Sequence, residues 1–490
     1  MKSKLNINHI NRWFAFFISI HVFFWTLLPS VFRYNLPMDA LEGAIWGRHF
    51  SLGYDKNPFM NGWLTGLAVH VSGTQGWTIY LLGQLSVAVC FIALYHFARK
   101  LTSPTYAFIA VFLLAFMTSY NLDAIDFDDN VLELALWMLT ILFFYSAVFD
   151  QKIRDWIYAG IFAGLSVMTK YYAAVLFLPM FLFLLMHSRK TFSQAGLYLA
   201  VGVATLISLP HFIWLFYHDF VTIHYAFGRV NDGHLTVWSH FLYPYKFVMP
   251  YLETCILPLL LFGSLYLGKK TWILRSSGGV TRAQWQFLLW MGFGPFVITV
   301  LLSLIFGWVL NAGWGQPLLT LWPLMLVIAW QPVVTPQRFY RFVAIGFFLL
   351  IVFWVGYAVS MWRAGDSSSA HYPGQKMAAG VTALWHQKYH TKLSYVMGLR
   401  FEAGNVAFYS EDKPQVYIDA DSVKSFWINQ KDLKRKGAVF VWDVERENFS
   451  GEMHARFPQL IDQPQQKFCY YKSDCASPVK LGIAFLPPRP

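Results

Sequence analysis

The stretch Trp13-Phe-Ala-Phe-Phe-Ile-Ser-Ile-His-Val-Phe-Phe-Trp-Thr-Leu-Leu-Pro-Ser-Val-Phe32 decides the class of fold. It contains no Asp, Glu, Lys or Arg. A helix of about 20 apolar residues is long enough to cross the hydrocarbon core of a bilayer. The run is longer than the apolar core of a cleavable signal peptide. We therefore expect a membrane-spanning helix close to the N-terminus.

The rest of the chain repeats this apolar pattern. Hydrophobic residues make up 56% of the sequence and charged residues only 13%, whereas soluble domains carry about 25% charged residues. Aromatic residues reach 19%, as is typical of chains that meet bilayer interfaces. The composition predicts an α-helical polytopic membrane protein with about eleven spans, of which the fifth, sixth and tenth are short: 13–32, 77–97, 104–120, 131–149, 156–169, 171–187, 194–216, 248–267, 285–306, 317–331 and 342–361.

The net charge of +12 does not indicate nucleic-acid binding, because the basic residues lie in short loops between apolar runs. Such loops mark the cytoplasmic side of a membrane protein. Their alternation with loops poor in Lys and Arg places the N-terminus inside, and an odd number of spans places the C-terminus outside. The sequence thus predicts a multi-pass inner (plasma) membrane protein, with these basic residues inside: Lys2, Lys4, Arg12, Arg99, Lys100, Lys152, Arg154, Arg189, Lys190, Lys269, Lys270, Arg275, Arg282, Arg338 and Arg341.

Two domains are expected. Residues 1–361 form the transmembrane domain, with outer loops 33–76, 121–130 and 217–250. Residues 362–490 have the composition of a soluble domain on the extracytoplasmic (periplasmic) side. Segments 393–397, 415–418 and 438–442 read as buried strands, and 401–409 and 422–433 as helices, which predicts a small α/β domain.

Two cysteines in this tail, Cys469 and Cys475, lie close together in the sequence. In an oxidising compartment such a pair is typical of a disulfide. Two free thiols are the alternative.

The first outer loop carries the strongest candidates for chemistry. Asp39 and Glu42 are spaced i, i+3 and share one face of a short helix. The same residues also fit a capping box, with Asp39 as N-cap and Glu42 reaching back. Lys56 precedes Pro58, and its ammonium group is a candidate ligand for a lipid phosphate. Snorkelling at the membrane edge is the alternative for Lys56.

Three further sets are weaker candidates. Arg48 and Lys170 are secondary candidates for phosphate binding, and Lys170 also fits the turn of a hairpin. The second outer loop holds an acidic motif, Asp126, Asp128, Asp129 and Asn130, which exceeds what helix capping requires. The histidines of the third loop, His224 and His234 among them, match no compact metal signature. Two interpretations are possible for His224 and His234: they bind a metal ion, or they are ordinary residues at the membrane interface.

In order along the chain, several motifs resemble those of the GT-C glycosyltransferases of the protein mannosyltransferase and aminoarabinose transferase type. The resemblance covers roughly residues 10–330. One departure is Asn57-Pro58-Phe59, where the family usually has two prolines. The matching motifs are Asp39-Ala-Leu-Glu42, Trp46-Gly47, Lys56-Asn57-Pro58-Phe59, Trp63, Asp128-Asp129-Asn130, Gly164-Leu-Ser-Val-Met-Thr-Lys170-Tyr171 and Trp314-Gly-Gln-Pro317.

This resemblance implies a polyprenyl-phosphate sugar donor, inversion at the sugar and a first-loop Asp as the catalytic centre. It implies an active site at the outer surface of the membrane that the protein spans. Some members of the family use a divalent metal cation and others do not. The expected acceptor is lipid A or lipopolysaccharide, or another envelope glycan; a protein acceptor is the alternative. Membrane lipids are the expected surroundings.

The chemistry agrees with these residues. A sugar on a lipid phosphate departs from an anion that needs a nearby cation, for which Lys56 is the best candidate. An acceptor hydroxyl needs one base, for which Asp39 is the candidate. A transporter or flippase is the alternative from a different class, although the sequence has no repeat and few charges within its spans. A membrane-bound phosphoethanolamine transferase is a weaker alternative, because it would need a site made of a metal ion and a Thr in a large soluble domain.

Overall fold

The computed structural model describes residues 7–231, 233, 235–267, 279–365, 368–445 and 448–489. The chain divides into two compact units. The helical unit comprises Met1–Thr26, Lys56–Met60 and Gly83–Val355. The sheet unit comprises Leu27–Asp55, Asn61–Leu82 and Gly356–Pro490. The sheet unit therefore takes in most of the first outer loop, which the predicted boundary at residue 361 assigned to the transmembrane domain.

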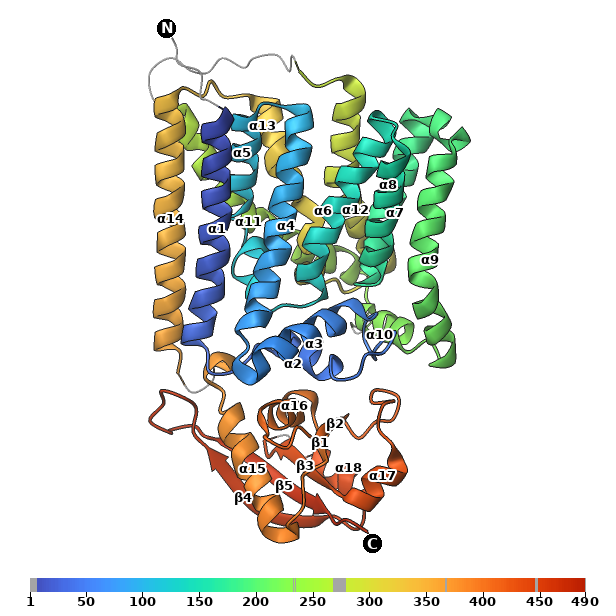
Figure 1. The fold of residues 1–490 in the computed structure, drawn as a ribbon, viewed down its shortest axis with the longest axis vertical. Helices are drawn as coiled ribbons and strands as arrows, with labels where there is room; N and C mark the ends of the chain where they lie inside the picture. The colour runs from blue at the N-terminus through green and yellow to red at the C-terminus, as the bar shows by residue number, and fades with distance from the viewer. Residues whose placement is uncertain are drawn as a thin grey trace. The chain divides into compact units, whose positions relative to one another are not determined.

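Each of the eleven predicted segments contains a helix, as the apolar runs require, because a backbone in lipid must satisfy its own hydrogen bonds. In Figure 1 these helices run side by side within the helical unit. α11 begins earlier than predicted and contains three prolines, Pro244, Pro250 and Pro258. The helices are α1 (Ile7–Phe32), α4 (Trp77–Leu101), α5 (Pro104–Leu114), α6 (Asp129–Phe149), α7 (Ile153–Val167), α8 (Ala174–His187), α9 (Ala195–Tyr217), α11 (Ser239–Gly263), α12 (Arg282–Phe306), α13 (Trp322–Trp330) and α14 (Pro336–Arg363).

Within the described part of the chain, eight helices are long and apolar enough to cross a membrane. They are α1, α4, α6, α9, α12, α14 and the segments Ser239–Tyr266 and Ala312–Trp330. α5 and the turns that follow it to Ile125 form a further candidate that is bent by 98°. α7 and α8 have only 15 and 14 residues, which agrees with the predicted shortness of the fifth and sixth segments.

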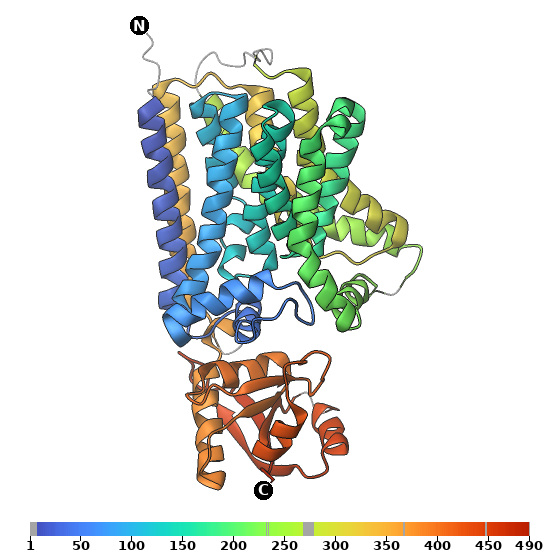
Figure 2. The ribbon, with the colours of Figure 1, turned by 45° about the vertical axis from the view of Figure 1, so that its right-hand side comes forward.

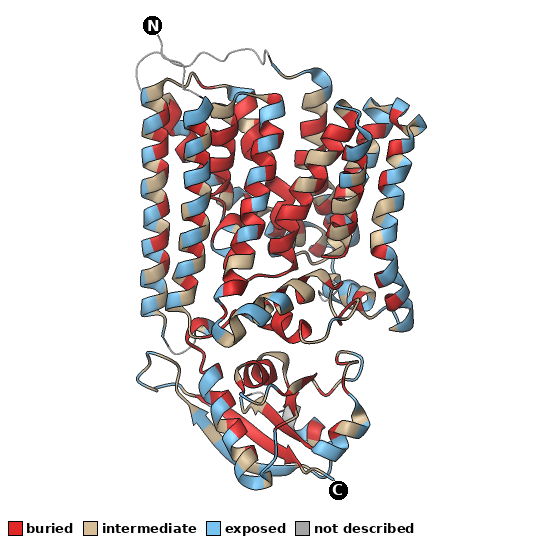
Figure 3. Ribbon diagram, in the orientation of Figure 1, coloured by how far each residue is buried: buried red, intermediate tan, exposed pale blue. Residues whose placement is uncertain are grey.

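α5 and α6 form the centre of the helical unit, and their residues are mostly buried (Figure 3). α9 and α12, by contrast, expose many apolar side chains, such as Leu206, Phe216 and Ile305. In a membrane-spanning bundle these side chains face lipid tails, which are as apolar as they are. The pattern of burial therefore fits the bilayer that the composition predicts.

The basic loops lie at one end of the helical unit. Lys100 at the end of α4 pairs with Asp150 at the end of α6, with 2.6 Å between Nζ and Oδ2. Arg341 near the start of α14 donates to the carbonyl oxygen of Ser264, beyond the end of α11, at 2.7 Å. This is the end at which α1 begins (Figure 1). Lys2, Lys4, Lys269, Lys270 and Arg275 lie outside the described residues.

This arrangement allows a test of the topology. A reporter that is active only outside the cytoplasm should be active when fused near Asn121 or Asn405 and silent when fused near Lys152, because positively charged loops stay inside. Parallel fusions of a reporter that is active only in the cytoplasm should give the opposite pattern. Activity of the external reporter at Lys152 would contradict the topology.

The sheet unit contains a five-stranded mixed sheet with strand order β2-β1-β3-β5-β4 (Figure 1). Figure 2 shows the same ribbon turned by 45°. The first three strands, β1 (Tyr395–Gly398), β2 (Gln415–Ile418) and β3 (Ala438–Asp443), are parallel. β5 (Val479–Leu486) pairs antiparallel with β3 and with β4 (Ile461–Phe468). The predicted α/β class is confirmed. β4 and β5 were not predicted from the sequence. The side chains of β4, Ile461-Asp-Gln-Pro-Gln-Gln-Lys-Phe468, are mostly polar and exposed, whereas β5 is mostly apolar and buried.

The helices of this domain are α15 (Gly374–Tyr389), α16 (Arg400–Tyr409), α17 (Gln430–Lys436) and α18 (Asn448–Arg456). The predicted helix over 422–433 is partly wrong. Asn429 caps α17 by accepting hydrogen bonds from the backbone of Lys431 and Asp432, and the residues before it form turns. Cys469 and Cys475 form a disulfide bond between β4 and β5, with Cα atoms 4.9 Å apart.

The first outer loop forms two helices, α2 (Met38–Trp46) and α3 (Met60–Ser72). They approach closely because two glycines meet: a Cβ atom on Gly47 would lie 2.4 Å from the Cα atom of Gly66. α2 also packs on α16, where a Cβ atom on Gly404 would lie 2.7 Å from Cδ1 of Ile45. α2 is therefore held between a helix of its own loop and a helix of the C-terminal region.

Candidate active site

Asp39 lies in the first turn of α2 and is half-buried. Pro37 is the N-cap of this helix, and no side chain caps it. The capping-box alternative for Asp39 and Glu42 is therefore wrong: the N-cap position is already taken by a residue whose ring fixes φ, so Asp39 is inside the helix. A carboxylate in a first helical turn is stabilised by the helix dipole.

Glu42, one turn after Asp39, forms an ion pair with Arg400 of α16. Nη2 of the same guanidinium pairs with Oδ2 of Asp55, and Nη1 lies 3.5 Å from Oδ1 of Asp55. Glu42 and Asp55 are only 5% and 4% exposed, so this cation stabilises two carboxylates that have little contact with solvent. Burial alone would lower the pKa of Arg400, but Glu42 and Asp55 raise it above its usual value.

Arg400 was not predicted from the sequence as a site residue. Locally it is only a single arginine at the start of a buried helical segment. The pairing joins residues far apart in the sequence, so no spacing rule finds it.

Arg48 anchors the first loop to the C-terminal region. Its guanidinium donates to the carbonyl oxygens of Pro414 and Ala407, at 2.8 and 3.0 Å. Burial lowers the pKa of Arg48 to about 10. Because two of its nitrogens bind backbone oxygens, Arg48 has a structural position in the sheet unit, and we do not retain it as a phosphate ligand.

Lys56 belongs to the helical unit. Its Nζ atom lies 5.7 Å from the centroid of the Tyr225 ring, in α10 (Val221–Val230). A few residues later, the backbone N–H of Met60 donates to the carbonyl oxygen of Met168 at 3.2 Å. This bond places the segment after Lys56 beside the stretch that ends in Thr169-Lys170.

The residues of the second acidic motif have different roles. Asp128 is the N-cap of α6 and accepts a hydrogen bond from the backbone of Val131 at 2.9 Å. Asp129 pairs with Lys170, with 2.9 Å between Oδ2 and Nζ. Lys170 also donates to Oδ1 of Asn130. Asp126 precedes the helix and is half-buried. Asp128 is thus a cap, whereas Asp129 and Asn130 bind Lys170. Lys170 stands just before the short turn η4 (Tyr171–Ala173).

Trp314 brings two cations together on one indole ring. Lys170 Nζ and Arg229 Cζ lie 5.9 and 5.8 Å from its centroid. Trp314 is part of η7 (Ala312–Leu319). Each cation–π contact of this kind stabilises a positive charge by about 0.5–2 kcal/mol.

A cavity of about 500 Å³ lies beside this group. Two basic side chains, Arg229 and Lys246, line it together with Tyr243, Asn311 and Trp314. Neither Lys246 nor Tyr225 was identified from the sequence, because a lone Lys or Tyr in an interfacial segment is common. The helical unit therefore contains a positively charged cavity that can accept an anionic group.

The described residues do not fit a dedicated metal site. Among them, no three His, Cys, Asp or Glu side chains are arranged to hold a metal ion. His224 lies in α10, and His234 lies outside the described residues. The place between Glu42 and Asp55 is taken by a guanidinium. We therefore derive no step through a metal ion.

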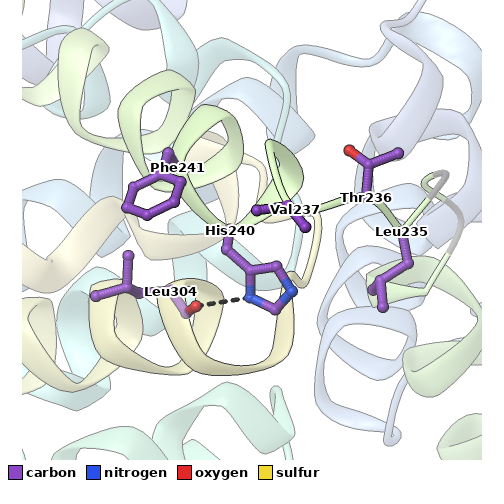
Figure 4. Close-up of a pocket in the computed structure, with 6 residues that line it drawn as sticks. All are labelled: Leu235, Thr236, Val237, His240, Phe241 and Leu304. Atoms are coloured by element: carbon purple, nitrogen blue, oxygen red, sulfur yellow. Dashed lines mark hydrogen bonds between the residues drawn. The ribbon is translucent and has the colours of Figure 1, made fainter.

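His240 has a different environment. It lines a pocket of about 700 Å³ with Leu235, Thr236, Val237, Phe241 and Leu304 (Figure 4). Its Nδ1 atom lies 2.8 Å from the carbonyl oxygen of Leu304, with which it shares a hydrogen bond. The remaining lining is almost entirely apolar, so this pocket suits a hydrocarbon chain better than a charged group.

Comparison with known proteins shows which fold the chain has. Residues 56–214 match the family model of the dolichyl-phosphate-mannose-protein mannosyltransferases. The crystal structure of ArnT from Cupriavidus metallidurans bound to undecaprenyl phosphate matches with a TM-score of 0.66, at 14% identity, over 98% of this chain and 99% of that chain. The chain shares the fold of ArnT, and its residues 56–214 resemble the mannosyltransferase family.

A second structure of the same fold is the mycobacterial arabinofuranosyltransferase AftD. It matches this chain with a TM-score of 0.50 and 13% identity, over 100% of this chain and 42% of that one. No curated protein matches the sequence. The family match includes Lys56, the second acidic motif and Lys170, so it coincides with the cationic and acidic groups of the helical unit.

Proposed function

We propose that this protein is a membrane glycosyltransferase that transfers a sugar from a polyprenyl-phosphate donor to a lipid acceptor of the cell envelope, lipid A or lipopolysaccharide, on the extracytoplasmic side. The observation that carries the proposal is the charge of the helical unit. Lys56, Arg229 and Lys170 lie over aromatic rings, and Arg229 and Lys246 line one cavity. Fixed cations beside a cavity are what a departing phosphate needs.

The proposed reaction is a single displacement. The acceptor hydroxyl oxygen forms a bond to the anomeric carbon of the sugar. The bond from that carbon to the phosphate oxygen breaks, and its electron pair stays on the polyprenyl phosphate. The hydroxyl proton passes to the Asp39 carboxylate as general base. Attack from the face opposite the phosphate inverts the anomeric configuration.

Lipids on both sides of the reaction agree with the apolar pocket of Figure 4. An isoprenoid or an acyl chain can lie against Val237, Phe241 and Leu304, because these side chains are as apolar as the lipid tails of a bilayer. This pocket supports a lipid substrate, whether the chain belongs to the donor or to the acceptor.

Mass spectrometry of envelope lipids and glycoproteins from cells with and without the gene tests the acceptor. We expect one lipid A or lipopolysaccharide species to lose the mass of one sugar when the gene is deleted. A mass loss confined to glycoproteins would contradict the lipid acceptor and establish a protein O-glycosyltransferase.

A further inference from the structure

Arg400 binds the first outer loop, and neither the sequence motifs nor the displacement mechanism explains this contact. It comes from α16, whose Gly404 lies against Ile45 of α2. This close helix contact brings the guanidinium between Glu42 and Asp55. A side chain from the C-terminal region is therefore built into the loop that carries Asp39.

Two carboxylates that are buried next to each other repel and lose their hydration, so they need a shared cation. Proteins supply it either as a divalent metal ion bound by carboxylate oxygens or as a guanidinium, whose planar fork fits carboxylates. Arg400 is itself mostly buried, with 12% of its side chain exposed. Its positive charge also acts on Asp419, next to β2.

We propose that Arg400 takes the place of a divalent metal ion in this loop, binding Glu42 and Asp55 and thereby fixing α2 and Asp39. Arg400 is a positioning residue, since it acts through these carboxylates. The inference rests on the proposed function, which makes Asp39 the base.

Two consequences follow from the chemistry. The enzyme should not depend on divalent ions, because the place between the carboxylates is filled. Removing the guanidinium should create a metal site, because Glu42 and Asp55 would then face each other as two oxygen donors without their cation. A purely structural role for Arg400 does not predict the second behaviour.

The experiment compares the full-length wild type with Arg400→Gln in detergent, in EDTA and in excess Mn²⁺. We expect EDTA and Mn²⁺ to change wild-type transfer less than twofold. Arg400→Gln in EDTA should be about 10- to 100-fold slower, mainly in kcat, and Mn²⁺ should restore most of that loss. Arg435→Gln is the matched control: it breaks an exposed ion pair with Asp432 in the same unit and should behave like the wild type.

A second readout does not require activity. Mn²⁺ should raise the thermal midpoint of Arg400→Gln by about 5 °C, because a ligand that binds only the folded state stabilises it. It should leave the wild type unchanged. The triple variant Glu42→Gln, Asp55→Asn, Arg400→Gln should lose the response. If Arg400→Gln folds only in Mn²⁺, the proposal is equally supported.

Arg400→Gln that is fully active in EDTA would overturn the proposal, as would a variant whose stability ignores Mn²⁺. An inactive wild type would instead contradict the proposed function, and the thermal response would still decide the role of Arg400.

Discussion

Asp39→Asn should slow sugar transfer by roughly 10² to 10⁴-fold while the protein stays folded, because the acceptor hydroxyl loses its general base. The substitution keeps the size and shape of the side chain. Asp39 lies in the first turn of α2 and does not cap it. Loss of its charge there costs about 0.3–1 kcal/mol of helix-dipole stabilisation. Initial rates at saturating donor and a thermal unfolding scan measure both effects.

Glu42→Gln is the comparison variant for this prediction. Glu42 binds Arg400, so its loss should lower the thermal midpoint more than Asp39→Asn does, since breaking a buried ion pair costs about 3–5 kcal/mol. The turnover of the folded fraction should fall less than in Asp39→Asn. A well-expressed Asp39→Asn protein with normal turnover would remove Asp39 from the mechanism.

Lys56→Met should lower kcat/KM for the donor about 10²-fold, because removing one preorganised group that stabilises developing charge has an effect of this size. Met keeps the apolar stem, so packing over the Tyr225 ring changes little. Expression and membrane insertion should be unaffected. Initial rates measured over a range of donor concentrations give the change.

Lys388→Met is the matched control for Lys56. Lys388 is exposed in α15 and also lies over an aromatic ring, with its Nζ 5.5 Å from the Phe485 centroid. We expect it to leave donor kinetics unchanged. If Lys56→Met has the same donor kinetics as this control, Lys56 is a snorkelling residue at the membrane edge.

The fold was largely predictable because hydropathy determines it. Apolar runs in lipid must form helices, and basic loops gather at one end of the bundle, as the pairs of Lys100 and Arg341 show. Within the C-terminal domain, three strands with buried apolar runs were predicted. β5 was missed although it is mostly buried and apolar, and β4 was missed because its exposed side chains follow no apolar pattern.

The candidate site was predictable only where its residues are neighbours in the sequence. Asp39 and Glu42, or Asp128 and Asn130, form recognisable local motifs. Arg400 belongs with Glu42 only because α16 packs on α2, and Arg229 belongs with Lys170 only because both lie over Trp314. Such tertiary contacts have no local sequence signal. The same contacts changed the interpretation of Arg48, whose two backbone acceptors lie beyond residue 400.

Sugar transfer by the purified protein in detergent tests the central claim most directly. The protein would be given a polyprenyl-phosphate donor with a radiolabelled sugar and a lipid A acceptor. We predict labelled acceptor and free polyprenyl phosphate in equal amounts, with no need for sealed vesicles and with Asp39→Asn nearly inactive. Label that never joins the acceptor in detergent, but crosses the membrane of sealed vesicles that contain the protein, would contradict a transferase and establish a transporter.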